Sequence, residues 1–269
     1  MTIKFGPAGL GSVKEAVSNL EKMHKLGIKA CEISFTYGPY IKEEDCGEIK
    51  KTAEKFEIQL SIHAPYWINL NSDDKKKLEM SKKRILASCK IGEALKAKYV
   101  VFHPGYYGKK TKEEAYANIR DSIKDIMQEL KKRKYKIKIA VETMGKVNVF
   151  GSVEEIKKLV KDTKCDFCLD FAHLLARSNG KMSYKEIVKE FKEFEIWRCH
   201  FSGIVYGDKG EKHHKVTPKE ELKKLLKELP KNYDITIINE SPEPLEDSVK
   251  ALNIWKSLWL INWFLQLVK

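Results

Sequence analysis

Histidines and carboxylates follow short apolar, β-branched runs at several places along this chain. His63 follows QLSI, His103 follows YVVF, and Glu142 follows IKIAV. Imidazole and carboxylate groups together are ligands that favour zinc, iron or manganese. The pattern therefore predicts a metal site that several strand ends assemble. Its candidate ligands are His63, His103, Glu142, Asp170, His173, His200, His213, His214 and Glu240.

The elements that would position these residues alternate between two kinds of segment. Short Val- and Ile-rich runs predict strands, and longer segments with apolar residues three and four apart predict helices, for example over 12–27, 76–97 and 112–135. Eight strand-helix units with strands buried on both faces are typical of a (β/α)8 TIM barrel, an α/β fold that we expect to span residues 1–269 as a single domain. A doubly wound open sheet is the alternative, but it usually has fewer strands and often a Gly-rich phosphate loop, which this sequence lacks. The predicted strands lie near 3–8, 29–35, 59–64, 98–103, 136–142, 165–170, 195–201 and 234–240.

Six candidate ligands fall at the C-terminal ends of the third to eighth predicted strands. A barrel brings these ends to one face, where barrel enzymes have their active sites. A single histidine at a strand end could be a hydrogen-bonded core residue. Six successive strands that each end in a ligand type favour a shared site instead. The six residues are His63, His103, Glu142, Asp170, His200 and Glu240.

The number of candidate ligands exceeds what one ion needs, because catalytic zinc usually has three protein ligands and a water. We therefore expect two or three ions, with Zn²⁺ first and Mn²⁺ or Fe²⁺ as alternatives. Glu142 lies in the middle of the series and is the candidate for a bridging, catalytic carboxylate. Closely spaced ions lower the pKa of a shared water and clamp both oxygens of an in-line phosphoryl displacement. This chemistry suits phosphodiester hydrolysis.

Composition is typical of a globular protein, with 42% hydrophobic and 33% charged residues. The net charge of +13 comes mainly from lysine, with runs at 75–77 and 131–134. Such runs are usually solvated helix faces, but the total charge would favour binding of a polyanion such as nucleic acid. The six cysteines are scattered and no signal peptide is evident, so we expect reduced thiols and a cytoplasmic protein.

The tail from Leu252 to Val268 is apolar, with Trp255, Trp259 and Trp263 on one helical face. Lys256, Asn262 and Gln266 interrupt it. It therefore predicts a helix that packs on the fold or on a partner subunit and does not span a membrane. We expect a monomer.

The motifs around the candidate ligands carry a family resemblance. They read HAPYWINL (63–70), HPG (103–105), ET (142–143), DFAH (170–173), HFSG (200–203) and ESPE (240–243). In this order, from about Phe5 to Pro244, the chain resembles the endonuclease IV family of zinc-dependent apurinic/apyrimidinic endonucleases. The resemblance implies a site for three zinc ions. It also implies incision of damaged double-stranded DNA 5′ to an abasic site during base excision repair.

The same resemblance distributes the ligands among the ions. It implies that Glu142 bridges two of them, one also held by two histidines and the other by three residues from later strands. The first set is His63 and His103, and the second is Asp170, His200 and Glu240.

The third ion is implied to be held by His173 and an Asp-x-His element in the loop after the seventh strand. Here that segment reads GEKHHKV. Glu211 with His213 preserves the spacing, whereas His214 is an equally available imidazole. Both histidines stay open as ligands.

For DNA, Tyr66 matches the family residue that inserts near the abasic nucleotide, and Trp67 could act as an apolar wedge in the minor groove. Both side chains could equally pack beneath their loop. The family uses a basic residue after the second strand, where this chain has no arginine and only Lys42. Arg177 is a candidate for a phosphate contact.

Two other functions fit parts of the pattern. A sugar isomerase or epimerase of the same xylose-isomerase-like superfamily would bind one metal through Glu142, Asp170, His200 and Glu240. That enzyme would leave the remaining histidines without a purpose, which favours the nuclease. A non-catalytic nucleic-acid-binding barrel with structural metals is the third possibility.

Overall fold

The computed structural model describes the backbone of residues 3–267 and the side chains of residues 3–258. Eight parallel strands form one sheet in the order β1-β10-β7-β6-β5-β4-β3-β2. All eight predicted strands are confirmed, with ends that differ by at most two residues. The strands are β1 (Ile3–Pro7), β2 (Ala30–Ser34), β3 (Gln59–His63), β4 (Tyr99–Phe102), β5 (Lys138–Glu142), β6 (Asp166–Asp170), β7 (Ile196–Phe201) and β10 (Asp234–Asn239).

The two edge strands of this order, β1 and β2, close the sheet into a barrel. Ala8 and Glu32 form a parallel bridge just beyond β1, and the Gly9 amide donates a 2.8 Å hydrogen bond to the Glu32 carbonyl. A Cβ atom on Gly6 would overlap the backbone carbonyl of Ala30. Glycine at this position therefore lets the two strands approach closely enough to close the barrel.

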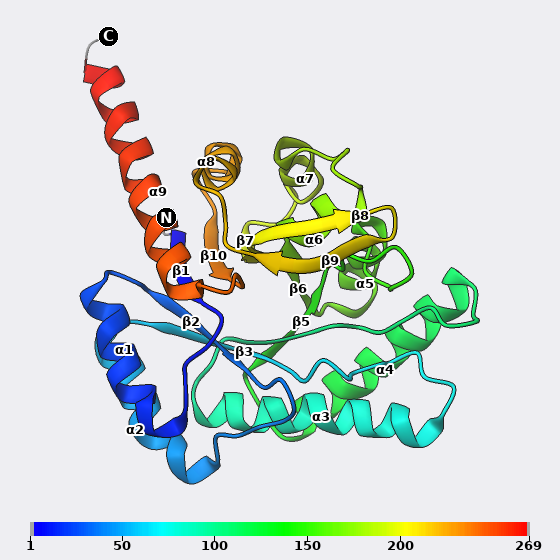
Figure 1. Cartoon of the computed structure of the whole chain (residues 1–269). Helices are drawn as coiled ribbons and strands as arrows, with labels where there is room; N and C mark the ends of the chain where they lie inside the picture. Colours follow the sequence, from blue (N-terminus) through cyan, green and yellow to red (C-terminus); the bar gives the residue numbers. More distant parts are fainter. Residues whose placement is uncertain (1–2, 268–269) are drawn as a thin grey trace.

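Helices follow most strands and cover the outside of the barrel (Figure 1). The three helical segments predicted from periodicity are confirmed, although the first begins with a 3-10 turn, η1 (Val13–Glu15). The α-helices are α1 (Ala16–Lys25), α2 (Cys46–Phe56), α3 (Lys75–Ala94), α4 (Lys112–Lys132), α5 (Val153–Thr163), α6 (Phe171–Arg177), α7 (Tyr184–Glu190), α8 (Lys219–Glu228) and α9 (Pro244–Leu267), and a second 3-10 turn is η2 (Glu43–Asp45).

The longest helix before the tail, α4, illustrates why these segments are helical. Its buried residues include Ala115, Ile119, Ile123 and Ile126, which recur every three or four positions. Thr111 begins it with a capping box to Glu114. The opposite face of the helix is polar and lies in solvent.

The tail helix α9 packs on the fold, as the sequence predicts. Ala251 and Ile254 are buried, and the partly buried Leu252 and Trp255 pack against the core. The predicted stripe also includes Trp259 and Trp263, which lie outside the described side chains. None of the helices that the structure describes combines the length and apolar character that a membrane crossing requires.

One element was not expected from the sequence. The segment after β7, predicted only as a loop, forms an antiparallel hairpin of β8 (Gly203–Gly207) and β9 (Gly210–Lys215). It lies against α6 and is not part of the barrel sheet (Figure 1). β8 (GIVYG) has only three side chains between two glycines and β9 (GEKHHK) is polar, so periodicity did not separate them from a loop.

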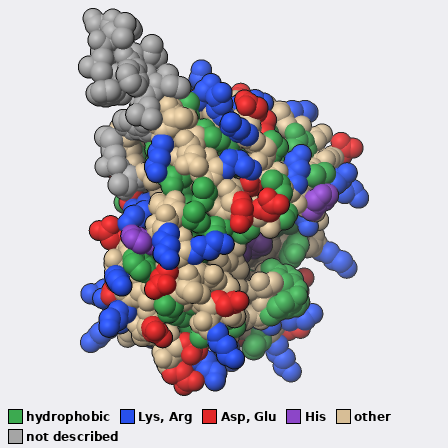
Figure 2. All heavy atoms as spheres, turned by 60° about the vertical axis from the view of Figure 1, so that its left-hand side comes forward, with side chains coloured by type: hydrophobic (Ala, Val, Ile, Leu, Met, Phe, Trp, Pro, Cys, Tyr) green, Lys and Arg blue, Asp and Glu red, His purple; other side chains and the backbone are tan. Residues whose placement is uncertain are grey.

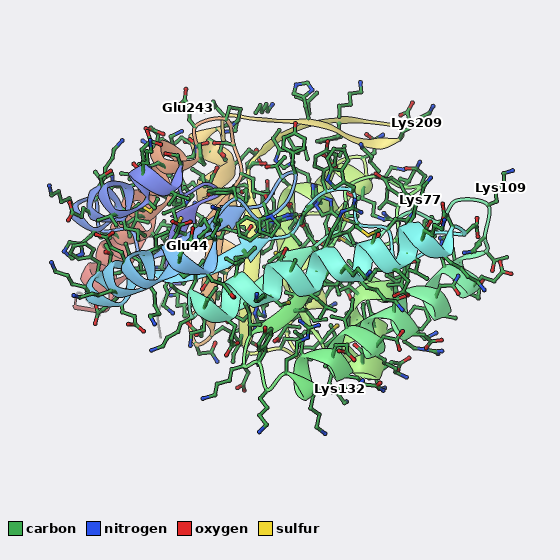
Figure 3. All side chains as sticks on the ribbon, turned by 90° about the horizontal axis from the view of Figure 1, so that it is seen from below. Glu44, Lys77, Lys109, Lys132, Lys209 and Glu243 are labelled. Carbon is green, nitrogen blue, oxygen red and sulfur yellow. The ribbon has the colours of Figure 1, made fainter. Side chains whose placement is uncertain are left out.

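The surface and the thiols agree with the expectations from composition. Basic and acidic side chains alternate over the face in Figure 2. In Figure 3, Lys77 and Lys132 of the two lysine runs point into solvent from α3 and α4. All six cysteines are free and buried.

The close approach at the barrel closure generates a stability prediction. We expect Gly6→Ala to lower the free energy of unfolding by about 1–3 kcal/mol, because its methyl group meets backbone that cannot move without opening the barrel. Urea unfolding followed by circular dichroism measures the change.

The matched control is Gly47→Ala on α2. An added Cβ there meets nothing within 4 Å, so alanine should raise the free energy of unfolding by about 0.5–1 kcal/mol through helix propensity. Equal stability of Gly6→Ala and the unmodified protein would contradict a steric limit at this closure.

Candidate metal centre

The barrel brings the predicted ligands to one face. Parallel strands end side by side there, and the register places Asp170 of β6 directly beside His200 of β7. Glu142, Asp170, His173 and His200 are buried, and the others are partly exposed except for His213, which is exposed. The strands and their following residues supply His63, His103, Glu142, Asp170, His200 and Glu240, and the first turn of α6 supplies His173.

A first group consists of two imidazoles and one carboxylate. The Nε2 atoms of His63 and His103 lie 3.0 Å and 3.1 Å from the same oxygen of Glu142, Oε2. The Nδ1 atom of His63 lies 2.8 Å from the Ala64 carbonyl oxygen, to which it can donate its proton. That hydrogen bond leaves Nε2 as the nitrogen that can bind an ion.

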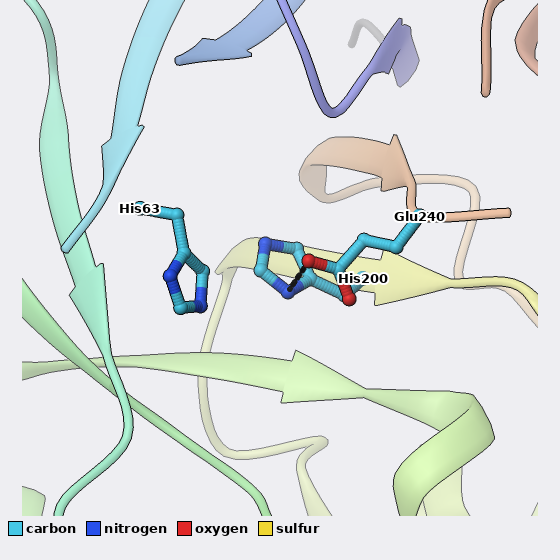
Figure 4. Close-up of side chains that lie close together, drawn as sticks. All are labelled: His63, His200 and Glu240. Atoms are coloured by element: carbon cyan, nitrogen blue, oxygen red, sulfur yellow. Dashed lines mark ion pairs between the residues drawn. The ribbon is translucent and has the colours of Figure 1, made fainter. Parts of the chain in front are cut away.

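A second group joins Glu142 to three residues of later strands, Asp170, His200 and Glu240. The Nδ1 atom of His200 lies 3.4 Å from an oxygen of Glu142 and 3.4 Å from an oxygen of Glu240. Figure 4 shows the Glu240 carboxylate against the His200 ring, with His63 facing them, and these three residues form a further ligand combination that links the first group to the second.

Asp170 provides a test of whether this group fits a cation. Its Oδ1 accepts a 2.7 Å hydrogen bond from the His173 amide and thereby caps α6. Its Oδ2 is buried and has no hydrogen-bond partner among the described residues. Burial is the main cause that raises the pKa of Asp170, and the charge of Glu142 adds to it. A bound divalent ion would compensate both carboxylates, so the donor set fits a metal.

A third group consists of His173, Glu211 and His214. The His173 Nε2 atom lies 3.4 Å from Glu211 Oε2, and the His214 Nε2 atom lies 3.7 Å from Glu211 Oε1. Ser202 Oγ contacts His214 Nδ1 at 2.7 Å and fixes the ring.

Of the two histidines that the sequence left open, the structure places His214 beside Glu211 and His173. His213 is exposed and belongs to no ligand group of the described residues. A register shift between Val205 and Tyr206 lets Glu211 and His214 face the same ligand group, although strict alternation would separate them. The spacing is thus carboxylate-x-x-His, which departs from the family pattern.

Glu142 is shared by the first two groups and has no exposed surface. Burial alone would raise the pKa of its carboxyl. The charges of His103 and His200, with hydrogen bonds from His103 and His173, outweigh burial and hold the pKa well below its usual range. This position, between two ligand groups and ionised, is the one a bridging carboxylate requires.

His63 shows the reciprocal shift. Burial lowers its pKa, but the hydrogen bond and charge of Glu142 outweigh this and raise the pKa to about 9. Without an ion, the imidazole therefore carries a proton at neutral pH.

Sequence reasoning missed one buried acid at this site, Glu32. It lies in the middle of β2, is 1% exposed, and has its Oε1 atom 2.9 Å from the Nε2 atom of His200. The available signal was a glutamate inside the apolar run ACEIS, where a buried parallel strand normally has none.

The side chains predicted to meet DNA lie in two different environments. Tyr66 and Trp67 are 44% and 45% exposed, and their ring centroids lie 4.2 Å apart with the rings tilted by 31°, so they do not pack beneath their loop. Tyr37, from the loop after β2, is 75% exposed and lies within 6 Å of both rings. Lys42, from the same loop, pairs with Glu44 at 3.5 Å. Contact of these residues with DNA stays a prediction.

Arg177 has structural partners that the sequence did not predict. Its Nη1 atom donates to the carbonyls of Lys146 and Val149 at 2.5 Å and 2.9 Å, and its Nη2 atom contacts the Tyr107 hydroxyl at 3.3 Å. The guanidinium therefore holds the loop after β5, and its contact with a phosphate stays a prediction.

Comparisons with known proteins agree with this architecture. An uncharacterized protein of Methanocaldococcus jannaschii is 33% identical over 269 residues, which cover 94% of this chain and 97% of that protein. An apurinic-apyrimidinic endonuclease of Caenorhabditis elegans is 30% identical over 149 residues, which cover 52% of this chain and only 37% of that protein. The solved structure of a D-tagatose 3-epimerase-like protein superposes with a TM-score of 0.71 at 24% identity, covering 97% of this chain and 99% of the other.

A family model described as a xylose isomerase-like TIM barrel matches residues 20–258. The match spans nearly all the barrel strands and all three ligand groups. The chain therefore belongs to the xylose isomerase-like TIM barrel family.

Proposed function

We propose that this protein is a zinc-dependent apurinic/apyrimidinic endonuclease that hydrolyses the DNA phosphodiester 5′ to an abasic site. The observation that carries the proposal is that the candidate ligands divide into three groups, two of which share Glu142, while a fourth combination, His63, His200 and Glu240, draws its members from the first two. The order of the HAPYWINL, HPG, DFAH and ESPE motifs supports it. So does the similarity of half the chain to the C. elegans endonuclease.

In this proposal Glu142 would bridge two ions, and each of the three ligand groups would hold one. Bound ions would lower the pKa of a water and neutralise charge on the phosphate oxygens. The protein residues would hold the ions and keep their own protons in place. His63 donates through Nδ1 to the Ala64 carbonyl, and Ser202 fixes His214. These hydrogen bonds keep the Nε2 atoms of both rings directed at the site.

The surface supports a nucleic-acid substrate. The net charge of +13 would favour a polyanion through counterion release. The exposed rings of Tyr37, Tyr66 and Trp67 lie on the loops after β2 and β3, on the same face as His63. Exposed aromatic rings of this kind stack on unpaired bases. An abasic site offers such a base on the opposite strand.

A second candidate is a one-metal sugar epimerase, favoured by the group of Glu142, Asp170, His200 and Glu240 alone. The first and third groups argue against it, since an epimerase with one ion does not need them. The number of zinc ions bound per chain distinguishes the two candidates.

The first prediction concerns a labelled duplex with one tetrahydrofuran abasic analogue. We expect zinc-dependent nicking 5′ to the analogue that a chelator abolishes, and no nicking of an undamaged duplex. Gel electrophoresis of the labelled strand measures it. Absence of nicking by protein shown to hold three zinc ions would contradict the abasic substrate.

The second prediction concerns the shared carboxylate. Glu142→Gln keeps the side-chain volume but weakens a bridge between two ions, so hydrolysis should fall by more than the roughly 10–100-fold that loss of an outer-shell partner costs. The fold should be retained by circular dichroism. Glu129→Gln, the same change on the exterior of α4, is the control and should leave the rate unaltered. Full activity of Glu142→Gln would rule out the bridging role.

The third prediction concerns protons. Because the pKa of His63 is raised to about 9 without an ion, zinc must displace its proton at pH 7, and apparent zinc affinity should rise as pH rises from 6 to 9. Calorimetric titration of chelator-treated protein in two buffers of different ionisation enthalpy measures the protons released. The His63→Asn variant should release fewer protons when it binds zinc. Identical heats of zinc binding in the two buffers would show that no proton is displaced and would contradict this prediction.

A further inference from the structure

Glu32 is a buried acid whose position the proposed ligand groups do not explain. It comes from β2, whereas its partner His200 comes from β7, and β1 and β10 separate these strands in the sheet order. The contact between them therefore crosses the inside of the barrel. Such a contact requires both side chains to point inward at the same depth.

The two oxygens of Glu32 have different partners. Oε2 accepts a 2.9 Å hydrogen bond from the Ser61 hydroxyl on the neighbouring β3. Oε1 forms a 2.9 Å ion-pair contact with His200 Nε2, and among the described residues neither of these two buried atoms has a partner in hydrogen-bond geometry. Burying a carboxylate this deeply costs free energy unless the group is paired. The pairing with His200 is therefore the feature of Glu32 that needs an explanation.

The other nitrogen of His200 faces the candidate metal centre. Its Nδ1 lies 3.4 Å from Glu142 and 3.4 Å from Glu240. The ring thus stands between Glu32 on one side and two ligand carboxylates on the other. An imidazole whose Nε2–H is directed at a carboxylate keeps its proton on Nε2 and presents the Nδ1 lone pair to an ion, and the carboxylate makes Nδ1 more basic.

The other imidazoles of the site are oriented differently. His63 and His173 each have Nδ1 within 3 Å of a backbone carbonyl oxygen, those of Ala64 and Thr143. Ser202 contacts His214. His200 differs from these three rings among the described residues. Its nitrogen on the side away from the site contacts a charged side chain, Glu32, which comes from another strand.

We propose that Glu32 is a positioning residue for the metal centre, which holds His200 in the form that binds an ion through Nδ1. Ser61 in turn fixes the Glu32 carboxylate. This inference rests on the metal-binding part of the proposed function and is independent of the substrate.

The test measures zinc binding and not activity. Zinc affinity of chelator-treated protein is determined at fixed pH by competition with a chromophoric chelator, for the unmodified protein, Glu32→Gln and Glu32→Ala. We expect Glu32→Gln, which keeps an acceptor but loses the charge, to weaken the tightest affected site by about 10-fold, and Glu32→Ala by up to about 100-fold. Glu129→Gln on the exterior of α4 is the control and should bind zinc normally.

A second readout separates positioning from a general loss of structure. Histidine nitrogen NMR spectra of zinc-free protein, recorded at a pH high enough to leave the His200 ring neutral, should report its proton on Nε2 in the unmodified protein and in Glu32→Gln, and a mixture of tautomers in Glu32→Ala. If Glu32→Ala does not fold, the zinc affinity of Glu32→Gln alone tests the proposal. Zinc affinity equal to that of the unmodified protein in Glu32→Gln, or in a folded Glu32→Ala, would overturn the proposal.

The outcome is separable from that of the nuclease assay. Weakened zinc binding by the Glu32 variants, together with no nicking of the abasic duplex by the unmodified protein, would retain the positioning role and reject the abasic substrate. Nicking of the abasic duplex by the unmodified protein, together with unchanged zinc binding by the Glu32 variants, would support the abasic substrate and reject the positioning role.

Discussion

The buried charge of Glu142 is the constraint on which the rest of the candidate site depends. A carboxylate removed from water is stable only where cations or hydrogen bonds surround it. Four imidazoles contact it, His63 and His103 at one oxygen and His173 and His200 at the other. They come from β3, the end of β4, α6 and β7, which only a closed barrel brings to one point. Barrel closure between β1 and β2 is thus a requirement of the site as well as of the fold.

Much of this arrangement was predictable because it depends on local pattern. The mostly apolar run IKIAV precedes Glu142, and a similar run precedes Asp170. Each run predicts a strand, and the carboxylate that follows it marks the strand end at which the site lies. Once eight such strands are counted, barrel topology places their ends together without knowledge of any long-range contact. The division of these residues into the first two ligand groups was implied by the family resemblance, and the structure brings the same residues together.

The remaining features depend on contacts that local pattern does not encode. The choice of His214 over His213 follows from a register shift between Val205 and Tyr206, which exists only once the hairpin has formed. Arg177 resembles an exposed arginine in sequence, yet carbonyls of a loop some thirty positions earlier take up its guanidinium. Glu32 was overlooked because its importance lies in a partner on the opposite side of the barrel interior.

The hairpin of β8 and β9 gives the third ligand group a different status from the other two. Glu211 and His214 lie on a hairpin outside the barrel sheet, whereas the ligands of the first two groups follow or lie within barrel strands. An insertion or deletion in this hairpin would remove or rebuild the group while every barrel strand kept its sequence and register. Selection can therefore act on the number of ions separately from the stability of the fold. Changes confined to the hairpin from Gly203 to Lys215 could therefore alter the metal content of the site while the rest of the protein stays unchanged.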